Sequence, residues 1–321
     1  MNPVFVGGLP RTGTSLITSL LDGHPQLIVC QDELSYFRKF LPQFRRQQTE
    51  IDKINFAKQY FLNQFDPENH YYRKYLSHIS IDKIHQLFSD ELTKRENTEK
   101  DIIEAYFIAY GTASNSLTPA TLRWVEKTPL VEQYAPTIFR WWEDTKFIHL
   151  IRDPRDLLAT YNRRAKKRNR PQPSIATVSY VWLKCVNYAI QNEKKFGSDR
   201  YLILYYEKFV SNPEIYVKKI VDFLNITENE CLLTPTKGGG KVPWRGNSSN
   251  RTEFTGISPV SVGKWKSDLH PNDVLLMESL CKSSMEDLGY TLSTAGSAFN
   301  FPAQLKLALL RLRAALVDSY Y

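Results

Sequence analysis

The sequence predicts an α/β fold in which a parallel sheet is flanked by helices. Two observations lead to this prediction. An apolar strand-like run at the start of the chain leads through a glycine-bearing turn into a helix, and strand-like and helix-like runs then alternate. At 321 residues, with 42% hydrophobic and 13% aromatic residues, the chain can bury a large core. We expect one domain over residues 1–295 and a separate tail over 296–321.

The order of the elements follows from their patterns. The first strand is expected over Val4–Val6, the first helix over Thr14–Leu21, and a short strand near Leu27–Val29. A later helix begins with a proline near its start and covers Pro213–Leu224. Further strands, each followed by a helix, are expected at Arg123–Val125, Lys146–Ile151 and Arg200–Tyr205.

Two segments interrupt the alternation. Residues from about 36 to 103 are polar and show helical periodicity, for example at Ile51, Ile54 and Phe61. They predict a helical insertion after the first strand–helix unit. Residues 234–259 are rich in Gly, Ser, Thr, Asn and Pro, which predicts a long irregular loop, and loops of this length are often functional.

The first turn has the composition of a phosphate-binding loop. From Gly8 the spacing is G-x-x-x-x-G-T-S, which is close to the nucleotide-triphosphate loop G-x-x-x-x-G-K-[ST]. Thr14 stands where that loop has its lysine, and Arg11 lies inside the turn instead. A strand, a glycine turn and a helix start direct backbone N–H groups and the helix dipole at one point. We therefore expect a P-loop-type sheet whose anion site is built for a ligand other than ATP.

A second strand and turn extend the comparison. The buried run 147–151 is followed by Arg152-Asp153-Pro154-Arg155-Asp156. Together with the first loop, this segment resembles the sulfotransferase family, which transfers sulfuryl groups from 3′-phosphoadenosine 5′-phosphosulfate (PAPS). The resemblance extends, in family order, to residues 124–129, 205–207 with 212–213, and 262–265. The motif layout is most similar to the tyrosylprotein-sulfotransferase branch.

The resemblance implies a set of donor-binding residues. The 5′-phosphosulfate would be held by the first loop, at Arg11, Thr12, Gly13, Thr14 and Ser15. The 3′-phosphate would be held by Arg152 and by Thr160, eight residues on, with Arg164 as a further arginine. The adenine side would contact Tyr206, with Tyr205 as the alternative. Lys264 and Ser249, later in the chain, would also contact the nucleotide. The product would be adenosine 3′,5′-bisphosphate (PAP).

The same resemblance assigns the chemistry. Glu33 is the expected general base, with Asp32 as a competitor because the spacing from the preceding Asp22-x-His24-Pro25 differs by one residue. Lys127 is expected to stabilise charge on the bridging oxygen, and Arg11 to add charge in the loop. No metal is expected. His24 and His149 are expected to be structural.

Charge and cysteine content restrict the partners. The net charge is +8 and the pI about 9.1, which suits an anionic cofactor. The basic cluster 163–170 could also suit nucleic acid, but it follows the segment expected to bind the 3′-phosphate, so we do not expect a nucleic-acid partner. Four cysteines are scattered without a C-x-x-C pair, so neither a zinc site nor a disulfide framework is indicated.

The acceptor and the location are less constrained. The expected acceptor carries a hydroxyl on a glycan, a glycolipid, a small metabolite or a tyrosine, under a lid formed by the insertion. The sequence shows no leader or membrane span, which favours a cytoplasmic, bacterial protein. The tail reads as a basic amphipathic helix that could touch a membrane surface. The alternatives are a P-loop small-molecule kinase and a catalytically silent binder of anionic ligands.

Overall fold

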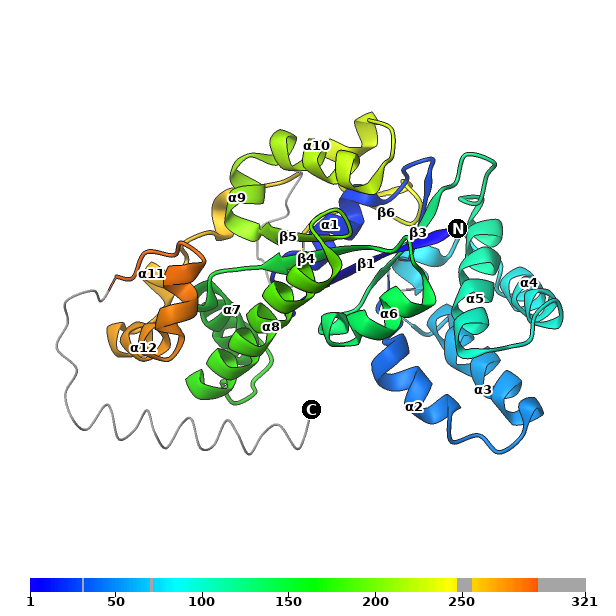
Figure 1. The fold of residues 1–321 in the computed structure, drawn as a ribbon, viewed down its shortest axis with the longest axis horizontal. Coiled ribbons are helices and arrows are strands. Elements are labelled where there is room, and N and C mark those ends of the chain that lie inside the picture. Colours follow the sequence, from blue (N-terminus) through cyan, green and yellow to red (C-terminus); the bar gives the residue numbers. More distant parts are fainter. Residues whose placement is uncertain (31, 70–71, 247–255, 294–321) are drawn as a thin grey trace.

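The computed structural model describes residues 1–30, 32–69, 72–246 and 256–293. Within these ranges the centre is a five-stranded sheet with the spatial order β2-β3-β1-β4-β5, and every neighbouring pair is parallel (Figure 1). The strands are β1 (Asn2–Gly8), β2 (Leu27–Val29), β3 (Arg123–Lys127), β4 (Lys146–Ile151) and β5 (Tyr201–Tyr205). This confirms the predicted α/β fold.

Alternating side chains of the strands divide the core between two faces of the sheet. Val4 and Val6 of β1 pack with α1 (Thr14–Leu21), α9 (Tyr206–Ser211) and α10 (Pro213–Leu224). Phe5 points to the other face and joins a second, aromatic cluster. Because both faces are covered, the central strands are apolar along most of their length, as buried parallel strands usually are.

Several helices cover the second face of the sheet and its neighbourhood. The chain from β3 to β5 forms α6 (Ala135–Trp141), α7 (Pro154–Lys167) and α8 (Ile175–Phe196). Two helices late in the chain, α11 (Trp265–Asp268) and α12 (Pro271–Asp287), pack on α7 and α8 (Figure 1). None of the helices in the described part of the chain has the length and apolarity needed to cross a membrane.

The helical insertion is longer than the sequence suggested. It contains α2 (Leu41–Phe44), α3 (Glu50–Leu62), α4 (Ile81–Thr93) and α5 (Glu99–Ser114), so it continues past residue 103. Helix α5 is buried along much of its length, and its Phe107 stacks on Trp124 of β3 with ring centroids 4.2 Å apart. The expected end near residue 103 therefore falls inside α5.

Two other expectations concern the later part of the chain. The segment 234–259 is not wholly irregular, since β6 (Thr236–Lys237) and β7 (Val242–Pro243) form a short antiparallel pair. The predicted donor contact Ser249 and the predicted amphipathic tail over residues 296–321 lie outside the described residues.

Candidate active site

The phosphate loop, residues 8–13 between β1 and α1, has the backbone of an anion cradle. Three of its residues have left-handed φ angles: Gly8 (125°), Arg11 (78°) and Gly13 (107°). The Thr12 hydroxyl donates to the Leu9 carbonyl at 2.8 Å, and the Thr12 N–H donates to the same oxygen at 3.2 Å. Both donors of Thr12 are thus used inside the loop, where they help to fix its shape.

A buried polar network supports the loop from below. The Gly8 N–H donates to Glu132 Oε2 at 3.0 Å, and Cys185 Sγ donates to Glu132 Oε1 at 3.2 Å. His149 Nε2 lies 3.1 Å from Cys185 Sγ, and its Nδ1 lies 2.6 Å from the Tyr201 hydroxyl. Burial lowers the pKa of His149 to about 3, which keeps the ring neutral. His149 is therefore structural, as expected.

This network is a feature that the sequence did not reveal. The side-chain atoms of Glu132, His149 and Cys185 that could bind a metal ion all lie within 4.8 Å of one another, and all three residues are buried. Burial raises the pKa of Glu132. These residues come from three separate segments and belong to no motif, so only the fold brings them together.

The expected base and the expected cation are in direct contact. Lys127 Nζ donates to Glu33 Oε1 at 2.6 Å, with the Lys127 side chain 6% exposed and the Glu33 side chain 45% exposed. Lys127 is the last residue of β3, paired in register with Val6 of β1, and Glu33 follows β2. The Ser35 N–H donates to Thr128 Oγ1 at 3.0 Å, which fixes the Glu33 segment against the end of β3.

Asp32, the competing base, has a different local role. Its Oδ1 accepts the backbone N–H of Glu33 at 2.8 Å. Burial raises the pKa of Asp32, and the charges of Lys127 and Lys237 oppose that shift. The structure therefore brings both carboxylates close to Lys127, but the hydrogen bond to its ammonium group belongs to Glu33.

Two further titratable groups beside this pair were missed by the sequence analysis. Burial lowers the pKa of Lys237, on β6, to about 8, and the positive charge of Lys127 adds to the shift. Burial raises the pKa of Glu126, which neighbours Lys127 and accepts from the Thr128 hydroxyl, to about 7. Lys237 lies in the segment predicted as an irregular loop, where its position could not be foreseen.

At the end of β4, Arg152 connects three parts of the expected donor site. Its Nη1 donates to the Arg11 carbonyl at 3.0 Å, and its Nη2 donates to the Ser261 carbonyl at 2.6 Å. The guanidinium lies over the Tyr206 ring at 4.4 Å. A Cβ on Gly13 would approach Tyr206 Cδ2 to 2.6 Å, so this ring packs directly on the phosphate loop. The expected adenine contact, Tyr206, thus lies against the phosphate loop.

Asp156 positions the late segment that contains Lys264. Its carboxylate accepts the N–H groups of Gly263 at 2.8 Å and Trp265 at 3.0 Å, on either side of Lys264. The other charged residue of this turn, Arg155, pairs with Asp153 at 2.7 Å and with Glu278 at 2.5 Å. These buried ion pairs give Arg155 a structural role.

Thr160 and Arg164 lie on α7, which follows Arg152. Thr160 is buried and accepts from Arg163 Nη2 at 3.3 Å. Burial lowers the pKa of Arg164 and of Arg11, and each is influenced by the negative charge of Glu33 in the opposite direction. Arg164 is therefore within electrostatic range of Glu33 and of Arg11 in the loop.

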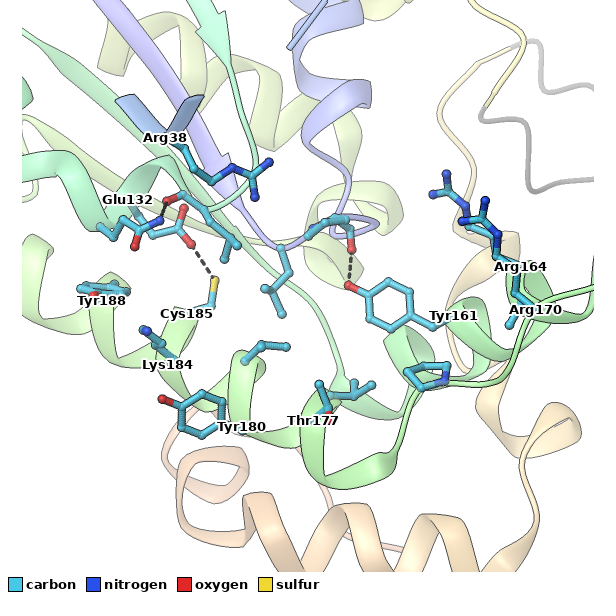
Figure 2. A pocket seen from close by; sticks show the side chains of 18 of the residues that line it. Arg38, Glu132, Tyr161, Arg164, Arg170, Thr177, Tyr180, Lys184, Cys185 and Tyr188 are labelled. Atoms are coloured by element: carbon cyan, nitrogen blue, oxygen red, sulfur yellow. Dashed lines mark hydrogen bonds between the residues drawn. The ribbon is translucent and has the colours of Figure 1, made fainter. Parts of the chain in front are cut away.

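A cavity of about 430 Å³ opens beside the loop, between α7, α8 and the turn after β3 (Figure 2). Tyr161 crosses it and donates its hydroxyl to the Pro10 carbonyl at 2.7 Å. The residues around the cavity are mainly apolar, with basic groups among them: Leu9, Pro10, Arg38, Leu130, Glu132, Gln133, Tyr161, Arg164, Ala165, Arg168, Arg170, Pro171, Pro173, Thr177, Val178, Tyr180, Val181, Lys184, Cys185 and Tyr188.

Comparison with known sequences identifies relatives of the chain. It is 23% identical over 294 residues to a protein-tyrosine sulfotransferase of Drosophila melanogaster, covering 89% of this chain and 51% of that protein. It is 22% identical over 300 residues to protein-tyrosine sulfotransferase 1 of Danio rerio, covering 89% of this chain and 72% of the relative. The chain thus spans about half the length of the Drosophila relative.

Comparison with solved structures agrees on the fold. The sulfotransferase domain of the Synechococcus PCC 7002 olefin synthase superposes with a TM-score of 0.54 at 21% identity, covering 88% of this chain and 95% of that one. The sulfotransferase domain from the curacin biosynthetic pathway gives 0.52 at 18% identity, covering 91% and 98%. A family model described as "Sulfotransferase family" matches residues 3–230, which is most of the chain. This chain belongs to the sulfotransferase family.

Proposed function

We propose that this protein transfers a sulfuryl group from PAPS to a hydroxyl acceptor by in-line displacement at sulfur. The observation that carries the proposal is the 2.6 Å contact between Glu33 and Lys127, at the end of the strand beside the phosphate loop. Sulfuryl transfer needs a base for the acceptor proton and a cation for the leaving oxygen next to an anion site. Both groups are present there.

In the proposed reaction, Glu33 takes the proton of the acceptor hydroxyl, whose oxygen forms the new bond to sulfur. The bond from sulfur to the bridging oxygen breaks, and its electron pair stays on the 5′-phosphate of PAP. Lys127 carries three N–H donors, so it can hold Glu33 and still donate to the bridging oxygen. Arg11 adds charge from the loop. Positioning and electrostatics do most of the catalytic work, as they do in phosphoryl transfer.

The rest of the donor is assigned to the β4 side of the loop. In the described part of the chain, the Nε groups of Arg11 and Arg152 are buried and have no hydrogen-bond partner, which suits them to bind phosphate oxygens. Thr160 and Arg164 on α7 and Lys264 beside Asp156 complete the proposed contacts. Tyr206, stacked under Arg152, would face the nucleotide.

Calorimetric titration with PAP and with ATP–Mg²⁺ tests the donor. We expect the wild type to bind PAP and to prefer it over ATP–Mg²⁺. Arg152→Lys keeps the charge but loses the planar fork, so it should weaken PAP binding by about tenfold or more. Arg140→Lys, at an exposed position on α6, is the matched control and should bind PAP as the wild type does.

The same titration separates the alternatives. A preference for ATP–Mg²⁺ would favour the kinase, although Thr14 stands in place of the phosphate-binding lysine of that class. Failure to bind either nucleotide would overturn the proposed function. PAP binding with no turnover by any acceptor, in a protein whose Glu33→Gln variant behaves identically, would favour the silent binder.

A further inference from the structure

We propose that the acceptor is a small amphipathic alcohol or phenol that carries a negative charge, and that its apolar body binds in the cavity between the phosphate loop, α7 and α8. This inference rests on the proposed sulfuryl transfer and adds the chemical class of the acceptor. It depends on the walls of the cavity, on the charges around it and on its position relative to Glu33.

Between the basic groups, the walls of the cavity are mainly apolar. Leu9, Leu130, Val178 and Val181 line it with aliphatic side chains, and several prolines and tyrosine rings add further apolar surface. The Tyr161 hydroxyl is already used by the Pro10 carbonyl. A sugar placed against the aliphatic part of the wall would lose hydrogen bonds to water that these side chains cannot replace. An apolar body gains by leaving water.

The volume suits a small molecule. About 430 Å³ lies in the lower part of the range of small-molecule sites, which is roughly 300–1,000 Å³. A hydrocarbon chain or a one- or two-ring aromatic body fits such a space.

The charged groups around the cavity are mainly positive. Among the described residues that line it, the basic ones are Arg38, Arg164, Arg168, Arg170 and Lys184, and Glu132 is a carboxylate. Glu132 is buried, and its oxygens already accept from Gly8 and Cys185. Figure 2 shows Arg164 and Arg170 together at one end and Lys184 at the other. Because Arg164 is assigned to the donor, a negative group on the acceptor would pair with Arg168 and Arg170.

The electrostatics of the arginines agree with this assignment. The positive charge of Arg168 lowers the pKa of both Arg11 and Arg164, and Arg170 acts on Arg164 in the same direction. For both Arg11 and Arg164, Glu33 is an opposing negative charge. The basic cluster 163–170, which the sequence analysis singled out, therefore faces the cavity with at least Arg164, Arg168 and Arg170.

The cavity adjoins the phosphate loop and the turn that follows Lys127. Leu9 and Pro10 line it immediately before Arg11 in the loop, and Leu130 lines it three residues after Lys127. Arg164 belongs to the cavity and is within electrostatic range of Glu33. In the proposed complex, a ligand whose body fills the cavity directs its hydroxyl past the loop toward the Glu33–Lys127 pair.

Matched probe pairs test the charge preference through kcat/KM with PAPS. One pair is 3-(4-hydroxyphenyl)propanoate and tyramine, and the other is 12-hydroxydodecanoate and 12-aminododecan-1-ol. We expect the anionic member to be favoured about tenfold in at least one pair. Arg170→Ala should reduce that preference severalfold. Lys166→Ala removes a charge from the last turn of α7, four residues before Arg170, at an exposed position that does not line the cavity, and should leave the preference unchanged.

A second variant pair tests where the apolar body binds. Val181→Phe fills part of the cavity and should lower kcat/KM for the favoured probe about tenfold, mainly through KM, with PAP affinity unchanged. Ile190→Phe places the same ring at a 47% exposed position on the same helix and should change neither quantity.

The outcomes distinguish this inference from the proposed function. A disaccharide and an acidic tyrosine peptide serve as comparison acceptors. The acceptor class would be overturned if only one of these were turned over, or if the cationic probes were preferred. It would also be overturned if a protein that binds PAP turned over no probe. Equal loss in Val181→Phe and Ile190→Phe would overturn the assignment of the cavity. Failure of the wild type to bind PAP would instead overturn the proposed function itself.

Discussion

Glu33 and Asp32 are neighbours in the chain, but Glu33 holds the contact to Lys127 and Asp32 caps the backbone of Glu33. Glu33→Gln should therefore lower kcat by about 10²–10⁴, the contribution typical of a general base, while PAP affinity stays near the wild-type value. Stability should change by less than about 1 kcal/mol because the Glu33 carboxylate is half-exposed. Steady-state kinetics and calorimetry measure both quantities.

Asp32→Asn is the control for that experiment. It preserves the shape of the side chain and its ability to accept the Glu33 N–H, so kcat should fall much less than in Glu33→Gln. A larger loss of kcat in Asp32→Asn than in Glu33→Gln would reverse the assignment of the base.

Glu126 gives a prediction about pH and stability. Burial raises its pKa to about 7 from an ordinary value of 4.5. The folded protein thus keeps a proton that the unfolded chain releases, and the stability from this group is full below about pH 4.5 and is lost as the pH rises through about 7. Glu126→Gln stays neutral, so its free energy of unfolding relative to wild type should rise between pH 5 and pH 8, by at most about 3 kcal/mol.

Urea unfolding at several pH values measures this difference. Glu228→Gln, at a position 73% exposed, should show no such pH dependence. If the difference between Glu126→Gln and wild type is flat from pH 5 to pH 8, Glu126 is ionised in the folded protein throughout that range.

The sequence could propose individual site residues where a short motif contains them. The phosphate loop, the Lys127 block and the Arg152 segment each lie within a few consecutive residues, and resemblance assigned them. Glu132, Lys237 and Glu126 were not found because their environment depends on burial and on partners far away in the chain. A pKa shift caused by desolvation has no local sequence signal.

The phosphate loop and α9 are coupled through Gly13. An alanine there would have a Cβ 2.6 Å from the Tyr206 ring, at a φ of 107°. We expect Gly13→Ala to destabilise the protein and to weaken PAP binding by tenfold or more, about 1.4 kcal/mol, because the ring and the loop must move apart. Calorimetry and urea unfolding test this together.

Gly289→Ala separates backbone strain from that contact. Gly289 also has a positive φ, 78°, but a Cβ there would meet nothing within 4 Å. It should cost only the left-handed strain, about 1–2 kcal/mol, and leave PAP affinity unchanged. Equal effects of the two alanine variants on PAP affinity would contradict a direct role of the Gly13–Tyr206 contact.

The predicted bounds of helices and strands were correct where the apolar periodicity and the Gly, Pro or polar residues at the ends of an element agreed. Helices α1 and α10 and strands β2 and β4 have the predicted bounds. The insertion extended beyond its predicted end because α5 packs on β3 through aromatic residues, and such burial hides the polar face that marks a helix. The pair β6–β7 is only two residues long in each strand, too short for an alternation to appear.

The charge of the whole protein predicts a dependence on salt. With a net charge of +8 and arginines around the site, PAP binding should weaken as ionic strength rises. We expect the PAP dissociation constant to rise about tenfold between 50 and 500 mM NaCl, a range over which the screening length falls from about 14 Å to 4 Å. Adenosine, which is uncharged, should bind equally at both salt concentrations. A PAP affinity that does not change with salt would contradict the electrostatic origin of the site.

The order of the strands fixes the spacing of the groups that would bind the donor. Across the sheet, the ends of β3, β1 and β4 present Lys127, the phosphate loop and Arg152 in that sequence. Neighbouring strands lie about 4.8 Å apart, so about 10 Å separates the outer two. Under the proposed function, Lys127 and Arg152 therefore select a donor by the distance between its sulfur and its 3′-phosphate. The hydrogen bonds between the strands set this distance. A nucleotide without the 3′-phosphate could occupy the phosphate loop but would leave Arg152 without its phosphate.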